Sequence, residues 1–291
     1  MPPTDKRVLA LYRPGSVHVV GNGFHVRNLF PSNEVGERLS PFLLLDYAGP
    51  TYYSGTDQPR GVGEHPHRGF ETVTIVHQGR VAHRDSAGNA GVVGPGDVQW
   101  MTAASGIVHE EKHEREFARQ GGTIQMVQLW VNLPRALKMS APRYQDIRDE
   151  TIPVVARGGA RVRVIAGELE GARGPAQTSS ALEVFDLRLA NGAEWETELP
   201  RGHTAALVVL SGRATVNGSH PPEDAEMALL DIEGEHVRVR AEAETTALLL
   251  GGAPLDEPVV AYGPFVMNTG EEIQRAIRDY QSGSMGHLAP A

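Results

Sequence analysis

The first half of the chain is predicted to be a series of short β-strands joined by turns. Hydrophobic and polar positions alternate along residues 72–79 (TVTIVHQG), which are also rich in β-branched side chains. A second strand-like run follows a Pro-Gly turn within residues 92–103, and a third covers residues 123–133. Short alternating runs separated by turn residues are typical of a β-sandwich or β-barrel.

The same pattern returns after residues 132–147, where prolines and charges interrupt it. Six further apolar runs follow, at residues 162–169, 181–189, 204–216, 227–232, 237–241 and 245–252. We therefore expect an all-β protein with two domains of the sandwich or barrel type, one over residues 1–140 and the other over residues 141–291.

The chain is predicted to close with one short helix at residues 270–281, within the second domain. Thr269 and Glu272 have the spacing of a capping box, which marks a helix start. The helix has a single apolar stripe, made of Ile273, Ala276, Ile277 and Tyr280. This stripe predicts that the helix docks on the β-body.

Composition narrows the range of functions. The 291 residues are 40% hydrophobic and 22% charged, which is ordinary for a globular protein that folds in water. The formal net charge of −9 and the absence of a dense basic block disfavour direct nucleic-acid binding. We find no continuous apolar segment that would fit a secretory signal at the N-terminus or be long enough to span a membrane. With no cysteine, disulfides and thiolate ligands are excluded, which fits the cytoplasmic location that we expect. We also expect a monomer.

Chemistry is indicated by histidines and carboxylates at even spacing. His65 and His67 are two residues apart, and so are His109 and Glu111. Residues two apart on a strand project from the same face. Glu71 would share the face of the first pair if the strand ran unbroken through Gly69. Two such pairs facing one barrel interior would offer four nitrogen and oxygen ligands to a metal ion.

Imidazole and carboxylate ligands suit divalent Fe, Mn, Ni, Cu or Zn. Four protein ligands would complete a tetrahedral zinc site of structural type, whereas an octahedral iron would keep about two positions open. Spacing alone does not choose between these. We interpret the other histidines of this region, His77, His83 and His113, as polar surface side chains.

A shift of 133 residues suggests that the two halves are duplicates. It aligns residues 69–82 with the segment that begins at Gly202. In this alignment, the candidate ligands of the first half correspond to other residue types: His65 to Glu198, His67 to Pro200 and Glu71 to Thr204. A metal site is therefore expected in the first domain alone.

Four stretches resemble the pirins, a branch of the cupin superfamily: HPHRGFETV, GPGDVQWMTAASGIVHEE, QLWVNLP and YGPFVMNTGEEIQRAIRDYQSG. The resemblance implies a bicupin fold, in which both domains are cupin barrels of the jelly-roll type, with one Fe(II) in the N-terminal barrel. The ligands that it implies are His65, His67, His109 and Glu111. General cupins place the carboxylate ligand where Glu71 stands, so Glu71 is a second candidate, either as ligand or as a nearby acid.

The resemblance implies activities of two classes. One is a dioxygenase similar to quercetin 2,3-dioxygenase, which opens the central ring of a flavonol with dioxygen; here Glu111 or Glu71 would accept the proton of the substrate hydroxyl. The other is an iron-responsive regulator that acts through a protein partner, such as a transcription factor or a metabolic enzyme. A metal that only stabilises the barrel is a third possibility.

An enzyme of this type would also need an apolar cavity beside the metal. Candidates for its wall, each also suited to ordinary core, are Phe42, Trp100, Met126 and Leu129, with Gln128 as a polar neighbour.

Overall fold

The structure is a computed structural model that describes residues 4–30, 38–219 and 224–289. Its secondary structure is dominated by strands, with two α-helices in the described ranges, which confirms the prediction of an all-β fold. Contacts divide the chain into two compact units. The histidine-bearing unit consists of Val17–Arg27, Leu44–Asp149 and Asp256–Ala291, and the second unit consists of Met1–Ser16, Asn28–Leu43 and Glu150–Leu255.

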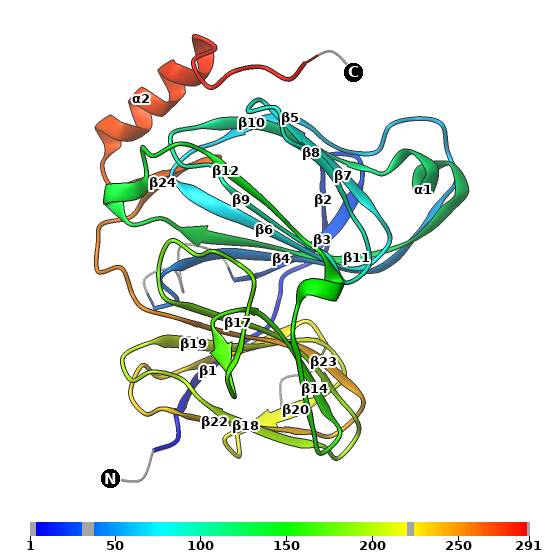
Figure 1. The fold of residues 1–291 in the computed structure, drawn as a ribbon, viewed down its shortest axis with the longest axis vertical. Coiled ribbons are helices and arrows are strands. Elements are labelled where there is room, and N and C mark those ends of the chain that lie inside the picture. Colours follow the sequence, from blue (N-terminus) through cyan, green and yellow to red (C-terminus); the bar gives the residue numbers. More distant parts are fainter. Residues whose placement is uncertain (1–3, 31–37, 220–223, 290–291) are drawn as a thin grey trace. The chain divides into compact units, whose positions relative to one another are not determined.

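The histidine-bearing unit is built on two antiparallel sheets, whose strands face each other in two layers (Figure 1). The smaller sheet has the strand order β5 (Gly61–His67), β10 (Ile107–His113), β7 (Val81–Asp85) and β8 (Ala90–Val93). The larger sheet has the order β12 (Arg143–Ile147), β9 (Val98–Thr102), β6 (Phe70–Gln78), β11 (Gly121–Asn132), β4 (Phe42–Ser54), β3 (Phe24–Phe30) and β2 (His18–Val20). The boundaries between the units fall within β3 and β4.

The interior of this unit is apolar on one side of the histidines. Val76, Val81, Ile124 and Met126 pack there with Phe24 in one buried cluster. Burial of these side chains from both layers stabilises the sheets by roughly 25 cal/mol for each Å² of apolar surface removed from water. The cluster fixes the two layers around the polar side chains described below.

The predicted C-terminal helix is confirmed as α2 (Gly270–Gln281), with Thr269 as N-cap and a complete capping box to Glu272. Its buried side chains Ile273 and Ala276 pack with Val108 of β10. Helix α2 therefore belongs to the histidine-bearing unit, and the grouping of the segments differs from a single cut after residue 140. The reason is that the chain returns after Leu255 and adds its last segment to the first barrel.

The remaining short elements of the histidine-bearing unit are α1 (Arg115–Gln120), a 3₁₀ turn (Arg135–Leu137) and the hairpin β24 (Val260–Tyr262) and β25 (Phe265–Met267). Neither helix of the described residues is long and apolar enough to cross a membrane.

The second unit also has two antiparallel sheets. Its larger sheet has the order β1 (Val8–Tyr12), β21 (Glu226–Leu230), β19 (Thr204–Ser211), β23 (Thr245–Gly252), β17 (Leu182–Leu189), β14 (Ala160–Ala166) and β13 (Val154–Arg157). The smaller sheet has the order β18 (Glu194–Glu198), β22 (His236–Ala241) and β20 (Ala214–Val216). A separate ribbon pairs β15 (Glu168–Leu169) with β16 (Ala172–Arg173), and a 3₁₀ turn spans Asp149–Thr151 at the boundary of the two units.

Strand pairing supports the predicted duplication. In the first unit β6 lies between β9 and β11, and in the second unit β19 lies between β21 and β23. The smaller sheets also agree, since β5-β10-β7 has its counterpart in β18-β22-β20. Gly79 and Gly212, which the shift of 133 residues aligns, both adopt a positive φ, of 85° and 89°. Such a φ favours glycine because it has no Cβ.

Candidate metal centre

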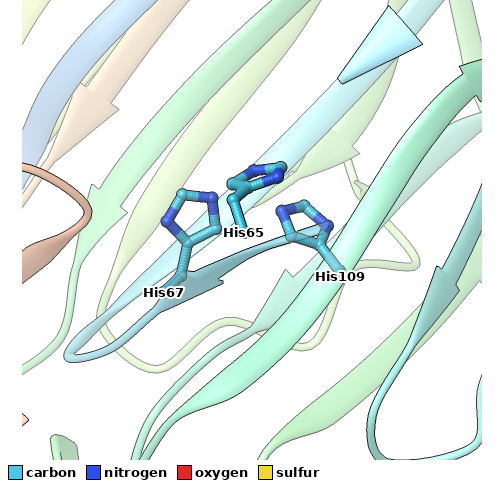
Figure 2. Close-up of side chains that lie close together, drawn as sticks. All are labelled: His65, His67 and His109. Carbon is cyan, nitrogen blue, oxygen red and sulfur yellow. The ribbon is translucent and has the colours of Figure 1, made fainter. Parts of the chain in front are cut away.

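Three histidines meet on the smaller sheet of the first barrel. Strands β5 and β10 are antiparallel neighbours, and their register sets His109 opposite His65 and Ile107 opposite His67. One nitrogen from each of His65, His67 and His109 lies within 4.8 Å of the others. Figure 2 shows the three rings gathered on these two strands. The arrangement follows from the same-face spacing of the two strands.

Two of the three rings are oriented by backbone carbonyls. The Nδ1 atom of His65 lies 2.8 Å from the carbonyl oxygen of Gly63, and the Nδ1 atom of His67 lies 3.4 Å from that of Pro264. A carbonyl only accepts hydrogen bonds, so both rings carry their proton on Nδ1. Their Nε2 atoms are then left with lone pairs that can bind a metal ion.

His109 is fully buried and is oriented by a side chain. Its Nδ1 lies 3.4 Å from Nδ1 of His83, which in turn contacts Asp85. Within the described part of the chain, the buried Nε2 atom of His109 has no hydrogen-bond partner. A buried polar atom without a partner is costly, and a bound ion would satisfy it.

The electrostatics favour neutral imidazoles. Burial, together with the neighbouring His65, lowers the pKa of His67 from 6.5 to about 3, against the opposing effect of the Pro264 carbonyl. Burial and the surrounding histidines also lower the pKa of His109 well below its ordinary value. Because only the neutral imidazole can bind a metal, these side chains fit a divalent ion without a prior loss of protons.

Glu111 lies on the same face of β10 as His109 but outside the group of three imidazoles. Its side chain is buried, and its Oε1 accepts a hydrogen bond of 3.3 Å from the Thr74 hydroxyl. The same hydroxyl lies 2.7 Å from Oε1 of Gln128. Among the described residues, the close ligand group contains the three histidines alone, so Glu111 as a ligand stays a prediction.

Glu71 faces away from the imidazoles. The condition for its same-face placement is not met, because β5 ends at His67 and β6 begins at Phe70 after a turn at Gly69 with φ of 88°. Its carboxylate accepts a hydrogen bond of 2.7 Å from Thr102. Strand alternation sets Glu71 on the face of β6 opposite to Thr74, which contacts Glu111.

The interpretation of His83 and His113 as surface side chains is wrong. Both are buried on the inward face of the smaller sheet. His83 stacks on Tyr144 and approaches His109, whereas His113 hydrogen-bonds the carbonyl oxygen of Gly23 at 2.8 Å. The alternation of β7, in which Val81, His83 and Asp85 are buried, was the sequence signal that could have indicated this.

The proposed cavity residues are all buried core: Phe42, Trp100, Met126 and Leu129. Trp100 and Leu129 both pair with Val73, on the face of β6 that Glu71 shares. The aromatic side chains beside the site are others. Phe70 and half-buried Trp130 pack against the ring of His67, with centroid separations of 5.0 and 5.3 Å.

The C-terminal segment supports the turn that follows His67. The Pro264 carbonyl also accepts a hydrogen bond from the backbone of Arg68, and the Arg68 side chain pairs with Asp279 of α2 at 2.7 Å. The buried Lys138 ammonium donates to the carbonyl oxygens of Gly69 and Val266, at 2.7 and 2.9 Å. Residues almost 200 positions away in sequence therefore hold one of the histidines in place.

Comparisons with known proteins agree with this architecture. Residues 23–131 match the family profile described as Pirin, and residues 184–286 match the Pirin C-terminal cupin domain. A Pseudomonas aeruginosa protein named "Putative quercetin 2,3-dioxygenase" is 53% identical over 281 residues, which cover 96% of this chain and 98% of that protein. The chain belongs to the pirin family. This confirms the resemblance and the two cupin domains.

Other pirins and solved structures extend the similarity. Human Pirin is 37% identical over 278 residues, which cover 91% of this chain and 89% of the human protein. A crystal structure of quercetin 2,3-dioxygenase from Acinetobacter baumannii has 49% identity and a TM-score of 0.96, and the match covers 98% of this chain and 100% of that one. A second A. baumannii structure of the same name matches with a TM-score of 0.85 at 26% identity, over 97% of this chain and 92% of that one.

Proposed function

We propose that this pirin is an Fe(II)-dependent dioxygenase that cleaves a flavonol such as quercetin. The observation that carries the proposal is the convergence of three imidazoles whose Nδ1 atoms are engaged and whose Nε2 atoms are left for one ion. The names of the P. aeruginosa and A. baumannii relatives support the choice of reaction.

The ligands in this proposal are His65, His67 and His109, with the Glu111 carboxylate as the fourth. This set of nitrogen and oxygen donors suits Fe(II), and it also suits Mn, Ni, Cu and Zn. A bound divalent iron would lower the pKa of a chelating substrate hydroxyl and supply the redox chemistry that dioxygen requires.

The carboxylate of Glu111 is the proposed acceptor of the proton that leaves the 3-hydroxyl of the flavonol. It lies on the inward face of β10, two residues beyond His109. The Thr74 hydroxyl, which also contacts Gln128, orients its Oε1 atom. Glu71 suits this role less well, because it lies on the opposite face of β6 and is engaged by Thr102.

The aromatic side chains beside His67 are suited to a planar phenolic substrate. The rings of Phe70 and Trp130 pack with their centroids 4.3 Å apart and their planes tilted by 34°, and Trp130 also packs edge-on against His67. Trp130 is half-buried, and its ring lies 5.3 Å from that of His67, centroid to centroid. An apolar ring here would exclude water from one side of the ion and favour an aromatic partner.

The test is single-turnover chemistry with the reconstituted protein. Metal-free protein is loaded anaerobically with Fe(II), mixed with quercetin and exposed to dioxygen. We expect carbon monoxide and the ring-cleaved product, each lost in the His109→Ala variant under the same loading. If wild-type protein with one bound iron yields neither product, the proposal is contradicted, and the iron-responsive regulatory role and a metal that only stabilises the barrel stay as predictions.

A further inference from the structure

Asp85 and His83 lie on the inward face of β7, beside the candidate metal ligands. The antiparallel register of β7 and β10 sets Asp85 opposite His109 and His83 opposite Glu111. The side chains of Asp85 and His83 are both inaccessible to solvent. His83 thus lies between a buried carboxylate and a candidate metal ligand, and water does not compete for its hydrogen bonds.

Asp85 is surrounded by hydrogen-bond donors. Its Oδ1 accepts the backbone N–H groups of Ala87 and Asn89, at 2.9 and 3.0 Å. Its Oδ2 accepts from the Asn89 amide at 2.9 Å and contacts Nε2 of His83 at 3.3 Å. An ionised carboxylate only accepts hydrogen bonds, so the contact to His83 requires a proton on Nε2 of that ring.

The proton on Nε2 of His83 determines which ring nitrogen of His109 is protonated. A neutral His83 with its proton on Nε2 has a lone pair on Nδ1, and this lone pair faces Nδ1 of His109 at 3.4 Å. His109 must then donate from Nδ1, which leaves the lone pair on Nε2. That Nε2 is the buried atom without a partner among the described residues.

The opposite pair of tautomers would be unfavourable. With its proton on Nδ1, His83 would turn a lone pair toward the Asp85 carboxylate, and His109 would carry an N–H on Nε2. That N–H would be buried with no acceptor within the described ranges. The opposite pair would therefore set a lone pair against a carboxylate and bury an unpaired N–H group, and a buried site tolerates both poorly.

We propose that Asp85 and His83 are positioning residues that fix His109 in the tautomer able to bind metal through Nε2. His65 and His67 obtain the same tautomer from backbone carbonyls, so among the three ligands His109 alone depends on side chains for it. The inference rests on the metal-binding part of the proposed function. It does not depend on the substrate or on the reaction.

The direct test is the tautomer of each ring in metal-free, full-length protein with ¹⁵N-labelled histidine. Long-range ¹H–¹⁵N correlation spectra distinguish the two neutral forms, and single substitutions assign the signals. We expect the proton of His83 on Nε2 and that of His109 on Nδ1. A proton on Nε2 of His109 would overturn the proposal, and the wild-type spectrum does not depend on whether Asp85→Asn folds.

Metal affinity provides the second test, with Co(II) alone as the probe. In Asp85→Asn the amide oxygen is held at the Oδ1 position by two backbone N–H groups, so the amide nitrogen faces His83 and reverses its tautomer. We expect affinity to fall about 10- to 100-fold, as for other groups that orient metal ligands. His83→Phe, which keeps an aromatic ring beside Tyr144, should also weaken binding.

Asp97→Asn is the matched control. Asp97 is another buried carboxylate that accepts backbone N–H groups, from Gly94 and Asp149, away from the histidines. We expect its metal-free form to lose thermal stability while its Co(II) affinity stays at the wild-type value. Wild-type affinity in Asp85→Asn, or equal losses of affinity in Asp85→Asn and Asp97→Asn, would overturn the proposal. Neither measurement involves flavonol cleavage. If the protein does not cleave a flavonol, the proposal about Asp85 and His83 can therefore still be tested.

Discussion

The guanidinium of Arg68 and the carboxylate of Asp279 form an ion pair of 2.7 Å, in which Arg68 is almost completely buried. Arg68 follows His67 directly, and Asp279 belongs to helix α2, 211 positions later in the chain. The pair therefore connects the C-terminal helix to the turn that carries a candidate metal ligand.

Removal of this carboxylate should weaken both the fold and the metal site. Asp279→Ala leaves a buried guanidinium with fewer partners, which costs roughly 1–3 kcal/mol of unfolding free energy. The control Asp57→Ala removes an exposed pair with Arg119 and should cost about 0–1 kcal/mol. Urea denaturation measures the stability, and Co(II) titration measures the affinity. Equal costs in the two variants would contradict the role assigned to the helix.

Substitution of single histidines should distinguish metal ligands, whose loss removes the metal, from core histidines, whose loss lowers stability. We expect His67→Ala and His109→Ala to abolish bound metal, because each removes one of three converging nitrogens. His113→Ala should keep the metal and lose stability instead, since His113 is buried and hydrogen-bonded to Gly23. Elemental analysis of the purified variants checks this. Metal loss in all three would show that the assignment of ligands is wrong.

Glu111 and Glu71 can be distinguished by isosteric amides. Glu111→Gln should weaken metal binding about tenfold or more, because a neutral amide replaces the proposed carboxylate ligand next to His109. Glu71→Gln should leave affinity unchanged, since Glu71 faces Thr102 on the other side of β6. Competition titration with a chelator provides the measurement. The reverse ranking would favour the ligand position of general cupins.

Acid should destabilise the metal-free protein through His67. Its pKa is about 3 in the folded protein and about 6.5 when the ring is free in water. Between these values the unfolded chain binds a proton that the folded chain does not, so the unfolding free energy falls as the pH is lowered through this range. His67→Phe should flatten that dependence. Urea denaturation of both metal-free proteins between pH 7 and 4.5 measures this dependence. An equal loss of unfolding free energy in the wild type and in His67→Phe would contradict the prediction.

The sequence predicted those features of the site that depend on local spacing. The pairs His65–His67 and His109–Glu111 share strand faces, as alternation requires. Glu71 would share the face of the first pair only if the strand ran unbroken through Gly69, and the turn at Gly69 starts a new strand, which spacing alone does not show.

Long-range contacts could not be predicted in the same way. The carbonyl of Pro264 reaches His67 only because the last segment returns to the first barrel. His83 lies beside His109 because β7 and β10 are neighbours in the sheet, and a single sequence does not give strand order. The capping box of α2 was predictable because all of its atoms lie within four residues of one another.

The central claim is that the Nε2 atoms of His65, His67 and His109 hold one divalent ion in the first barrel. Anomalous diffraction at the iron edge, from crystals of the Fe(II)-loaded protein, tests it most directly. We predict one peak per chain, at about 2.1 Å from each of the three Nε2 atoms. A peak in the second unit, or one bound through Nδ1 atoms, would contradict the account.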